Sequence, residues 1–225
     1  MSLKKNKIIV TGGPTREWFD PIRYISNASS GKMGVALADE AFRISGNTVF
    51  IHGPINEQLV QNRKFRCVSV ESTADLLEAV LKELEEPCVL IMAAAPADYT
   101  PVEKSEEKIK KSEGDLIINM KRTPDILKNV AEVRAEKGLE RIFVVGFAAE
   151  TNDTENYAKN KLVQKNLDMI CLNDVSREGA GFNVDTNIMT LFTRDGSRFE
   201  LPMMSKEKVA QEILRRIDIE LAKRG

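Results

Sequence analysis

The sequence is poor in the residues that most often carry covalent or metal-assisted catalysis. It has a single histidine, His52, and three cysteines, Cys67, Cys88 and Cys171, in 225 residues. One histidine argues against a histidine-based triad or a zinc site. The cysteines are odd in number, lack C-x-x-C spacing and lie in apolar, strand-like surroundings, so we expect buried reduced thiols rather than disulfides, metal ligands or nucleophiles.

The chain also lacks a charge excess and a long apolar run. Its 33 basic and 34 acidic residues nearly cancel, so nothing indicates a nucleic-acid surface. No apolar run approaches the roughly 18 residues of a membrane helix, and the first residues lack the apolar core of a signal peptide. We therefore expect a soluble, cytoplasmic protein with no nucleic-acid or membrane partner, long enough to bury a sizeable core.

The most informative segment is residues 8–34. The apolar run Ile8-Ile9-Val10 predicts a buried strand, which stops at Thr11-Gly12-Gly13-Pro14, and Ser29-Ser30-Gly31-Lys32 then opens an amphipathic helix. A strand, a glycine loop and a helix N-terminus form the usual anion site of α/β proteins. The spacing fits neither G-x-G-x-x-G nor a P-loop, so a glycine-rich turn without a ligand stays the alternative.

Strand and helix patterns alternate along the rest of the chain. This alternation predicts an α/β fold with a doubly wound, mostly parallel, Rossmann-like sheet and a C-terminal antiparallel hairpin, in a single domain of residues 1–225. The expected strands are 8–10, 48–51, 66–70, 88–93, 116–120, 141–146 and 168–172, and the hairpin is 188–201. The expected helices run from about Met33 to Gly46, from the Ser72 cap to Leu84, from Thr123-Pro124 onward, over 154–165, and over 205–223.

Ligands of such folds lie beyond the carboxyl ends of the strands, where four segments stand out. The first is the glycine loop. The second, 93–99, has small residues that let a ligand lie against the backbone, with Asp98 as its charge. The charged run 103–111 follows it, and is either a solvated loop or a lid that closes over an anion.

The third segment begins at Gly146 and contains Phe147, which either stacks on a base or packs in the core. In the helix that follows, Lys161 and Lys165 lie one turn apart on the same face. Two like charges at this spacing favour an anion between them or a solvated face. The fourth segment is Asn173-Asp174-Val175, which ends its strand with two polar side chains.

Taken together, these segments resemble the phosphopantothenate–cysteine ligases of coenzyme A biosynthesis, and the resemblance covers nearly the whole chain. It is carried by GGPTRE (12–17), DPIRYISNASSGKMG (20–34), AAPADY (94–99), EKIKK (107–111), GFAAET (146–151), KLVQKN (161–166) and NDVS (173–176). The decarboxylase domain of many bacterial members is absent upstream, so the resemblance implies a stand-alone ligase. The two lysine-rich segments follow the bacterial, CTP-using pattern.

The resemblance implies the following site residues. Asn27 and Lys108 would be catalytic, with Lys108 in a flap of about residues 101–114. Phosphopantothenate or its acyl-nucleotide would be held by Arg23, Asn27, Ala94, Ala95 and Asp98. The nucleotide would be held by Gly12, Ser29, Gly31, Gly34, Asp98, Lys108, Pro124, Asp125, Ile126, Leu127, Phe147, Lys161 and Lys165.

The implied reaction joins 4′-phosphopantothenate to L-cysteine through an acyl-cytidylate, with CTP as co-substrate and Mg²⁺ on its phosphates, in a homodimer to which the hairpin 188–201 contributes. It needs no protein nucleophile, which agrees with the missing triads. No metal ligand is assigned to a side chain, and whether a separate decarboxylase docks stays open. The alternatives are an NAD(P)-dependent short-chain reductase, for which Tyr157 and Lys161 have the Tyr-x-x-x-Lys spacing, and a non-catalytic nucleotide-binding protein.

Overall fold

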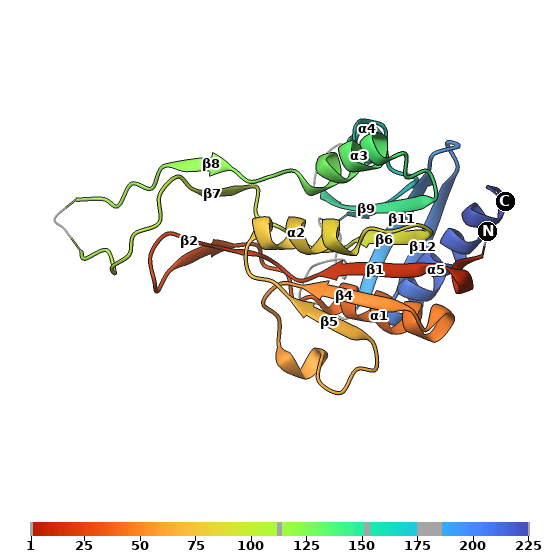
Figure 1. Ribbon diagram of the computed structural model, residues 1–225, viewed down its shortest axis with the longest axis horizontal. Coiled ribbons are helices and arrows are strands. Elements are labelled where there is room, and N and C mark those ends of the chain that lie inside the picture. Colours follow the sequence, from red (N-terminus) through yellow and green to blue (C-terminus); the bar gives the residue numbers. More distant parts are fainter. Residues whose placement is uncertain (1, 112–113, 151–153, 175–185, 225) are drawn as a thin grey trace.

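The computed structural model describes residues 2–111, 114–150, 154–174 and 186–224 and is built around one large sheet (Figure 1). Its strands are β1 (Lys7–Gly12), β4 (Thr48–His52), β5 (Arg66–Ser69), β6 (Cys88–Met92), β9 (Ile142–Glu150), β10 (Met169–Asp174), β11 (Thr186–Thr193) and β12 (Arg198–Ser205). Their order across the sheet is β12-β11-β10-β9-β6-β1-β4-β5. The pairs from β10 to β5 are parallel, and those of β11 with β10 and β12 are antiparallel. The predicted sheet and C-terminal hairpin are therefore confirmed.

Five α-helices cover the two faces of this sheet within the described chain. They are α1 (Lys32–Ser45), α2 (Thr73–Glu83), α3 (Ile126–Lys137), α4 (Thr154–Gln164) and α5 (Lys206–Ala222), with short 3-10 turns η1 (Leu3–Lys5) and η2 (Glu57–Leu59). Strand side chains alternate between the faces: Ile8 and Val10 pack with α1 and α5, whereas Ile9 packs with α2, α3 and α4. Strands covered on both faces are apolar throughout, which explains their near-continuous hydrophobic runs.

The helix ends follow local sequence signals with one exception. Ser72 and Asp75 form a capping box at the start of α2, and Gly46 ends α1 in the left-handed conformation, with a φ of 71°. The prediction that a helix starts at Thr123-Pro124 was wrong, because α3 begins at Ile126 with Asp125 as its cap. The Thr123 side chain is used elsewhere, since its hydroxyl donates to the Ala97 carbonyl at 2.7 Å.

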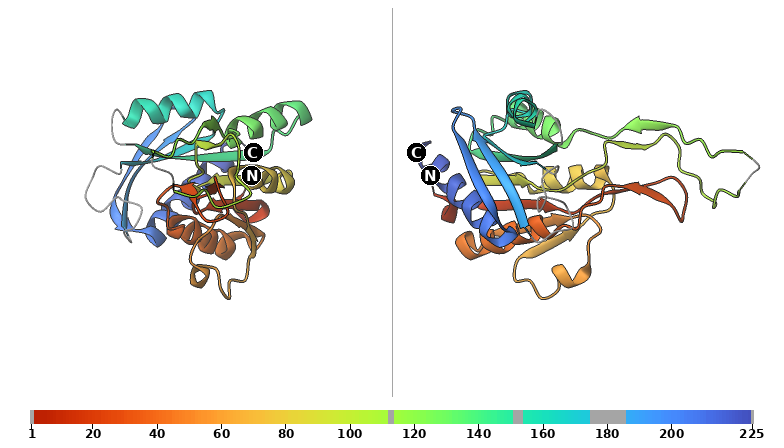
Figure 2. Two further views of the ribbon diagram at one scale, coloured as in Figure 1. Left: turned by 90° about the vertical axis from the view of Figure 1, so that its left-hand side faces the viewer. Right: turned by 180° about the vertical axis from the view of Figure 1, so that it is seen from behind.

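An arm of two β-hairpins projects beyond the carboxyl end of the sheet (Figures 1 and 2). One hairpin pairs β2 (Arg16–Trp18) with β3 (Tyr24–Ser26), and the other pairs β7 (Tyr99–Pro101) with β8 (Met120–Arg122). The predicted strand 116–120 is wrong except for its last residue. Leu116 and Ile117 are 50% and 84% exposed on this arm, so their apolar character reflects no place in the core.

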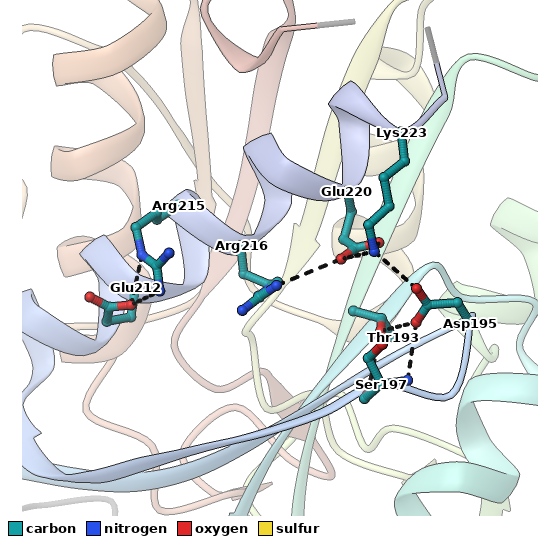
Figure 3. A network of polar contacts seen from close by, with 8 residues as sticks. All are labelled: Thr193, Asp195, Ser197, Glu212, Arg215, Arg216, Glu220 and Lys223. Carbon is teal, nitrogen blue, oxygen red and sulfur yellow. Dashed lines mark hydrogen bonds and ion pairs between the residues drawn. The ribbon is translucent and has the colours of Figure 1, made fainter.

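A polar network fixes the end of α5 to the β11–β12 turn (Figure 3). Lys223 Nζ lies 2.9 Å from the Asp195 carboxylate and 2.8 Å from that of Glu220. Asp195 also accepts bonds from the Thr193 hydroxyl and the Ser197 amide, and the Thr193 bond is the main reason why the pKa of Asp195 lies well below its usual value. The network lies at the end of the molecule opposite the arm (Figure 1).

The prediction of buried, reduced thiols is confirmed for two cysteines, but the third thiol is not buried. Cys88 and Cys171 are buried and reduced, and burial raises the pKa of Cys88 to about 11. Cys67 is also reduced but exposed, because it lies on the edge strand β5. Among the described helices, none is long and apolar enough to cross a membrane.

Candidate functional site

The sheet order brings the four polar or glycine-rich segments together. The first two come at the ends of β1 and β6, and the other two form the last residues of β9 and β10; these four strands are consecutive neighbours in the sheet. The predicted end of a strand at Gly146 was wrong, because β9 continues to Glu150. Because the pairing among these four strands is parallel, their carboxyl ends lie along one edge. The predicted meeting of the segments is confirmed for the described residues, whereas Thr151, Val175 and Ser176 of the quoted motifs lie outside them.

Two adjoining cavities open along this edge. The first, the glycine-loop cavity, measures about 390 Å³, and the second, the α3 cavity, about 540 Å³. Of the residues implied by the resemblance, the glycine-loop cavity is lined by Asn27, Ser29, Gly31, Gly34, Ala94, Ala95, Asp98, Phe147 and Lys161. The α3 cavity is lined by Ala94, Asp98, Pro124, Asp125, Ile126, Leu127, Phe147, Lys161 and Lys165. Ala94, Pro96, Asp98, Phe147 and Lys161 belong to both linings and form a shared wall.

The N-terminus of α1 opens into the glycine-loop cavity. Gly31 caps it with a φ of 77° and has no side chain with which to accept a bond from the first amides of the helix. Gly12 lines neither cavity, but Gly12 and Gly34 let α1 approach β1, because a Cβ at Gly12 would lie 3.1 Å from the Gly34 Cα and one at Gly34 would lie 2.7 Å from the Gly12 Cα. An anion in this cavity would therefore meet amide donors and the positive end of the helix dipole.

The segment 94–98 separates the two cavities and is held by its backbone. The Ala94 amide donates to Thr11 Oγ1 at 3.1 Å, and the Ala95 amide donates to the Gly13 carbonyl at 2.9 Å. The Asp98 carbonyl accepts the Thr123 amide at 3.0 Å. These bonds present the small side chains and the exposed Asp98 carboxylate to a ligand on a fixed backbone.

Asn27 ties the glycine-loop side to this segment. Its Nδ2 group donates to the Ala95 carbonyl at 3.3 Å and to the Pro96 carbonyl at 2.9 Å. The side chain is otherwise exposed and lines the glycine-loop cavity. Asn27 thus fixes the backbone at Ala95 and Pro96 and lines the cavity in which a ligand would lie.

Lys161 of α4 and Lys165, in the turn directly after α4, both line the α3 cavity. Lys161 Nζ donates to the Phe147 carbonyl at 3.0 Å, and Lys165 pairs with Asp125 at the start of α3. Partial burial opposes ionisation of Asp125, but the Lys165 ammonium, the Lys128 amide and the charge of Lys161 together hold the pKa of Asp125 below its usual value. An anion bound in the α3 cavity would therefore compete with Asp125 for the Lys165 ammonium, or bind it together with Asp125.

Arg23 and Lys108 lie on the arm and line neither cavity of their own chain. The Arg23 guanidinium binds the buried Asp20 carboxylate, with Nε at 2.9 Å, and donates to the Ile109 carbonyl at 3.0 Å. This pairing is the main reason why the pKa of Asp20 lies well below its usual value. Lys108 is exposed in the predicted flap, of which residues 112 and 113 lie outside the described chain.

Several lining residues carried no sequence signal. Asn187 and Met189 of β11 and Lys206 at the start of α5 reach the glycine-loop cavity from the C-terminal region. Asn173 joins them, as the fourth segment predicted. An isolated asparagine or lysine cannot be distinguished from a surface residue by its sequence context, so only the fold identifies this wall.

An α/β sheet with a helix N-terminus and two adjoining cavities at its carboxyl edge defines a protein of the Rossmann-like α/β class. The family model described as the DNA/pantothenate metabolism flavoprotein C-terminal domain matches residues 3–220, and the chain belongs to this family.

Curated relatives agree with this membership. The coenzyme A biosynthesis bifunctional protein CoaBC of Bacillus subtilis is 45% identical over 216 residues, which cover 96% of this chain and 52% of that protein. The Escherichia coli protein of the same name is 44% identical over 215 residues, covering 94% of this chain and 51% of that protein. The chain therefore spans about half the length of these relatives.

Solved structures show the same fold. The C-terminal domain of CoaBC superposes with a TM-score of 0.80 at 36% identity, covering 99% of this chain and all of that one. A mutant of Cab2 in complex with phosphopantothenate-cysteine superposes with a TM-score of 0.73 at 17% identity, covering 98% of this chain and 89% of that one. The second likeness shows the fold alone.

Proposed function

We propose that this chain is a phosphopantothenate–cysteine ligase of coenzyme A biosynthesis. The observation that carries the proposal is the meeting of Asn27, Asp98, Phe147 and Lys161 around one shared wall, in a domain of the family to which the chain belongs. The short-chain reductase is not supported. Tyr157 is 61% exposed and lines neither cavity, and the relatives named above are coenzyme A biosynthesis proteins.

The proposed reaction has two steps. The carboxylate of 4′-phosphopantothenate attacks the α-phosphate of CTP, which forms an acyl-cytidylate and expels pyrophosphate. The amine of L-cysteine then attacks the acyl carbon, expels CMP and loses a proton to solvent. Neither step needs a protein nucleophile, so the chain's task is to position the reactants and to neutralise phosphate charge.

The two cavities suit the two halves of an acyl-nucleotide. The α1 N-terminus and Ser29 would face phosphate groups, and Lys161 at the shared wall would reach charge in either cavity. Asp98 on the shared wall, and Asn27 beside it in the glycine-loop cavity, would face the acyl–phosphate linkage. We assign the base to the α3 cavity beside Pro124 and Leu127.

Magnesium would enter with the nucleotide. In the described chain no group of three histidine, cysteine, aspartate or glutamate side chains forms a metal cage, and Mg²⁺ characteristically uses one or two carboxylates with phosphates and waters. Asp98 is the carboxylate on the shared wall, whereas Asp125 is paired with Lys165. The bound ion would neutralise triphosphate charge beside Asp98.

We further propose a homodimer formed through the arm. Most of the large apolar side chains that are exposed in the described chain lie there: Ile22, Tyr24, Ile25, Tyr99, Val102, Leu116 and Ile117. A patch of this kind marks an interface. A second copy seated on the arm would also bring Arg23 and Lys108, which lie apart from their own cavities, towards the cavities of the partner.

The reaction is tested by pyrophosphate release with each nucleoside triphosphate in turn, with and without cysteine. We expect release with CTP and phosphopantothenate before cysteine is added, at up to one equivalent per site, and continuous turnover once it is present. A non-catalytic binding protein would release none. Equal turnover with ATP and CTP would contradict the assignment of CTP.

A further inference from the structure

A chain of hydrogen bonds leads from a buried carboxylate to the wall between the cavities. Glu17 of β2 is 5% exposed, and its Oε1 accepts both the Thr73 amide at 2.9 Å and the Thr73 hydroxyl at 2.8 Å. The Thr73 hydroxyl lies 3.0 Å from that of Thr15, and Thr15 Oγ1 accepts the Ala97 amide at 2.9 Å. Ala97 immediately precedes Asp98.

The hydrogen bonds of this series all run in one direction, from donor to acceptor towards Glu17. The Thr73 hydroxyl has one proton, and its nearest acceptor is Glu17 Oε1 at 2.8 Å, closer than the Ala97 carbonyl at 3.3 Å. With that proton on Glu17, the Thr73 oxygen accepts the Thr15 proton, and Thr15 Oγ1 accepts the Ala97 amide. Each bond polarises the next one, which strengthens such a series in a buried setting.

Helix capping explains one of the two bonds that Glu17 accepts. The capping box pairs Ser72 with Asp75, and Glu17 accepts the amide of Thr73, the first residue of α2. The bond from the Thr73 hydroxyl lies outside this cap, and it is the bond that continues to Thr15 and Ala97. This second bond points to a role of Glu17 beyond the stability of α2.

The series of hydrogen bonds ends at Ala97, between Pro96 and Asp98 of the shared wall. The Ala97 carbonyl also accepts the Thr123 hydroxyl at 2.7 Å, and Thr123 leads directly into the 124–127 lining of the α3 cavity. The peptide groups on either side of Ala97 are therefore fixed by Thr15, Thr73 and Thr123, while Glu17 fixes Thr73. Removing the carboxylate would leave the buried Thr73 amide without its acceptor and would free the Thr73 hydroxyl to turn to the Ala97 carbonyl.

We propose that Glu17 is a positioning residue for the ligase reaction, holding Ala97, and through it Asp98 and Thr123, in the orientation that the reacting groups require. Glu17 touches no ligand in this account. Since β2 is also the base of the arm, the same carboxylate links the seating of the arm to the site. This inference rests on the proposed function.

The test compares Glu17→Met, which removes the acceptor, with Glu17→Gln, whose amide oxygen can still accept both Thr73 bonds. Displacing reacting groups by about 1 Å can cost a hundredfold in rate, so we expect Glu17→Met to lower kcat by about tenfold to a hundredfold per folded molecule. We expect the KM for CTP to change less than about threefold, and Glu17→Gln to restore kcat to within about threefold of wild type. The exposed Glu71, changed to Met, is the matched control and should leave kcat unchanged.

A second variant distinguishes loss of the hydrogen-bond series from misfolding of Glu17→Met. Thr73→Val keeps the shape and removes one hydroxyl of the chain, and should lower kcat in the same way. The double variant Glu17→Met/Thr73→Val should then be no slower than the worse single variant, because both act through one chain. Additive losses would overturn the proposal, as would a normal kcat in Glu17→Met.

Amide hydrogen exchange provides a readout that does not depend on the reaction. The Ala97 amide should exchange faster in Glu17→Met than in wild type or in Glu17→Gln. An unchanged exchange rate overturns the positioning role whatever the activity. An inactive wild-type protein contradicts the proposed function, and the exchange experiment still decides whether Glu17 holds Ala97.

Discussion

At the scale of single residues, Asn27 is the position where a small change separates the two half-reactions. Its amide hydrogens bind the Ala95 and Pro96 carbonyls, and Asn27→Asp would place a negative charge against those two oxygens and beside the phosphate. We expect impaired amide formation, so that the acyl-cytidylate becomes detectable by mass spectrometry when phosphopantothenate and CTP are supplied. If Asn27 only stabilises a turn, both half-reactions will fall in proportion and no intermediate will accumulate.

Lys161 in α4 and Lys165 just after it line the same cavity but have different partners, so their removal should have different effects. Lys161 reaches the wall shared by both cavities, and Lys161→Ala should weaken CTP binding by at least about tenfold with little change in melting temperature. Lys165 pairs with Asp125 in a partly exposed position, where ion pairs contribute roughly 0–1 kcal/mol. Titration calorimetry measures the CTP affinity of each variant, and thermal unfolding measures its melting temperature. A lower melting temperature with unchanged CTP affinity in Lys161→Ala would assign this lysine to the fold.

The site shows what single-residue signals in the sequence can and cannot reveal. Asp98, Phe147 and Lys161 were predictable because they lie at or just beyond the carboxyl-terminal part of a strand or repeat at helical spacing. Glu17, Thr15 and Thr73 were not, because their role depends on contacts between residues up to 82 positions apart in the chain. Hydroxyl chains of this kind leave no periodic pattern.

At the scale of elements, the start of α2 allows a test of local stability. Ser72→Ala removes the hydroxyl that accepts the Asp75 amide at 3.1 Å, and should lower the free energy of unfolding by ~1 kcal/mol at pH 7. Bonds from the Ser72 amide and hydroxyl hold the pKa of Asp75 below its usual value. The Asp75 contribution is therefore present above about pH 4 and is lost as the pH falls through the lowered pKa. Urea unfolding at pH 7 and pH 3 should show a smaller difference between the two proteins at pH 3, and an equal difference would contradict the capping account.

The flap gives a second prediction at this scale. Lys108 is exposed on the arm, so Lys108→Gln should leave the fold intact. If its ammonium reaches phosphate charge in the assembled enzyme, turnover should fall at least about tenfold. Steady-state kinetics with a circular dichroism control measures this, with the neighbouring exposed Lys110→Gln for comparison. Near-normal turnover in Lys108→Gln would contradict the flap assignment.

Elements of the sheet were predictable and those of the arm were not, for a physical reason. Strands such as β6 are buried on both faces and read as continuous apolar runs, and the helices between them carry one apolar stripe each. The arm strands β2, β3, β7 and β8 have three residues each and bury little, so neither pattern develops. The predicted strand 116–120 failed for the same reason, since exposed apolar residues look like core residues in sequence.

At the scale of the whole molecule, the distribution of exposed apolar residues predicts how two copies meet. We expect a dimer in analytical ultracentrifugation, and Leu116→Glu/Ile117→Glu should shift it to monomer, because charged side chains on an apolar interface are costly to desolvate. Met203→Glu, on the exposed edge strand β12, is the matched control for the expected contribution of the hairpin. If Met203→Glu dissociates the dimer and the arm variant does not, the interface lies at the β11–β12 hairpin and the proposal for the arm is wrong.

The measurement that tests the central claim most directly is product formation from purified protein, 4′-phosphopantothenate, L-cysteine, CTP and Mg²⁺. The account predicts 4′-phosphopantothenoylcysteine by mass spectrometry, with one pyrophosphate and one CMP formed per amide bond, and no product when any one substrate is omitted. If CTP binds but no amide is formed under these conditions, the protein is a nucleotide-binding protein and the ligase account is wrong.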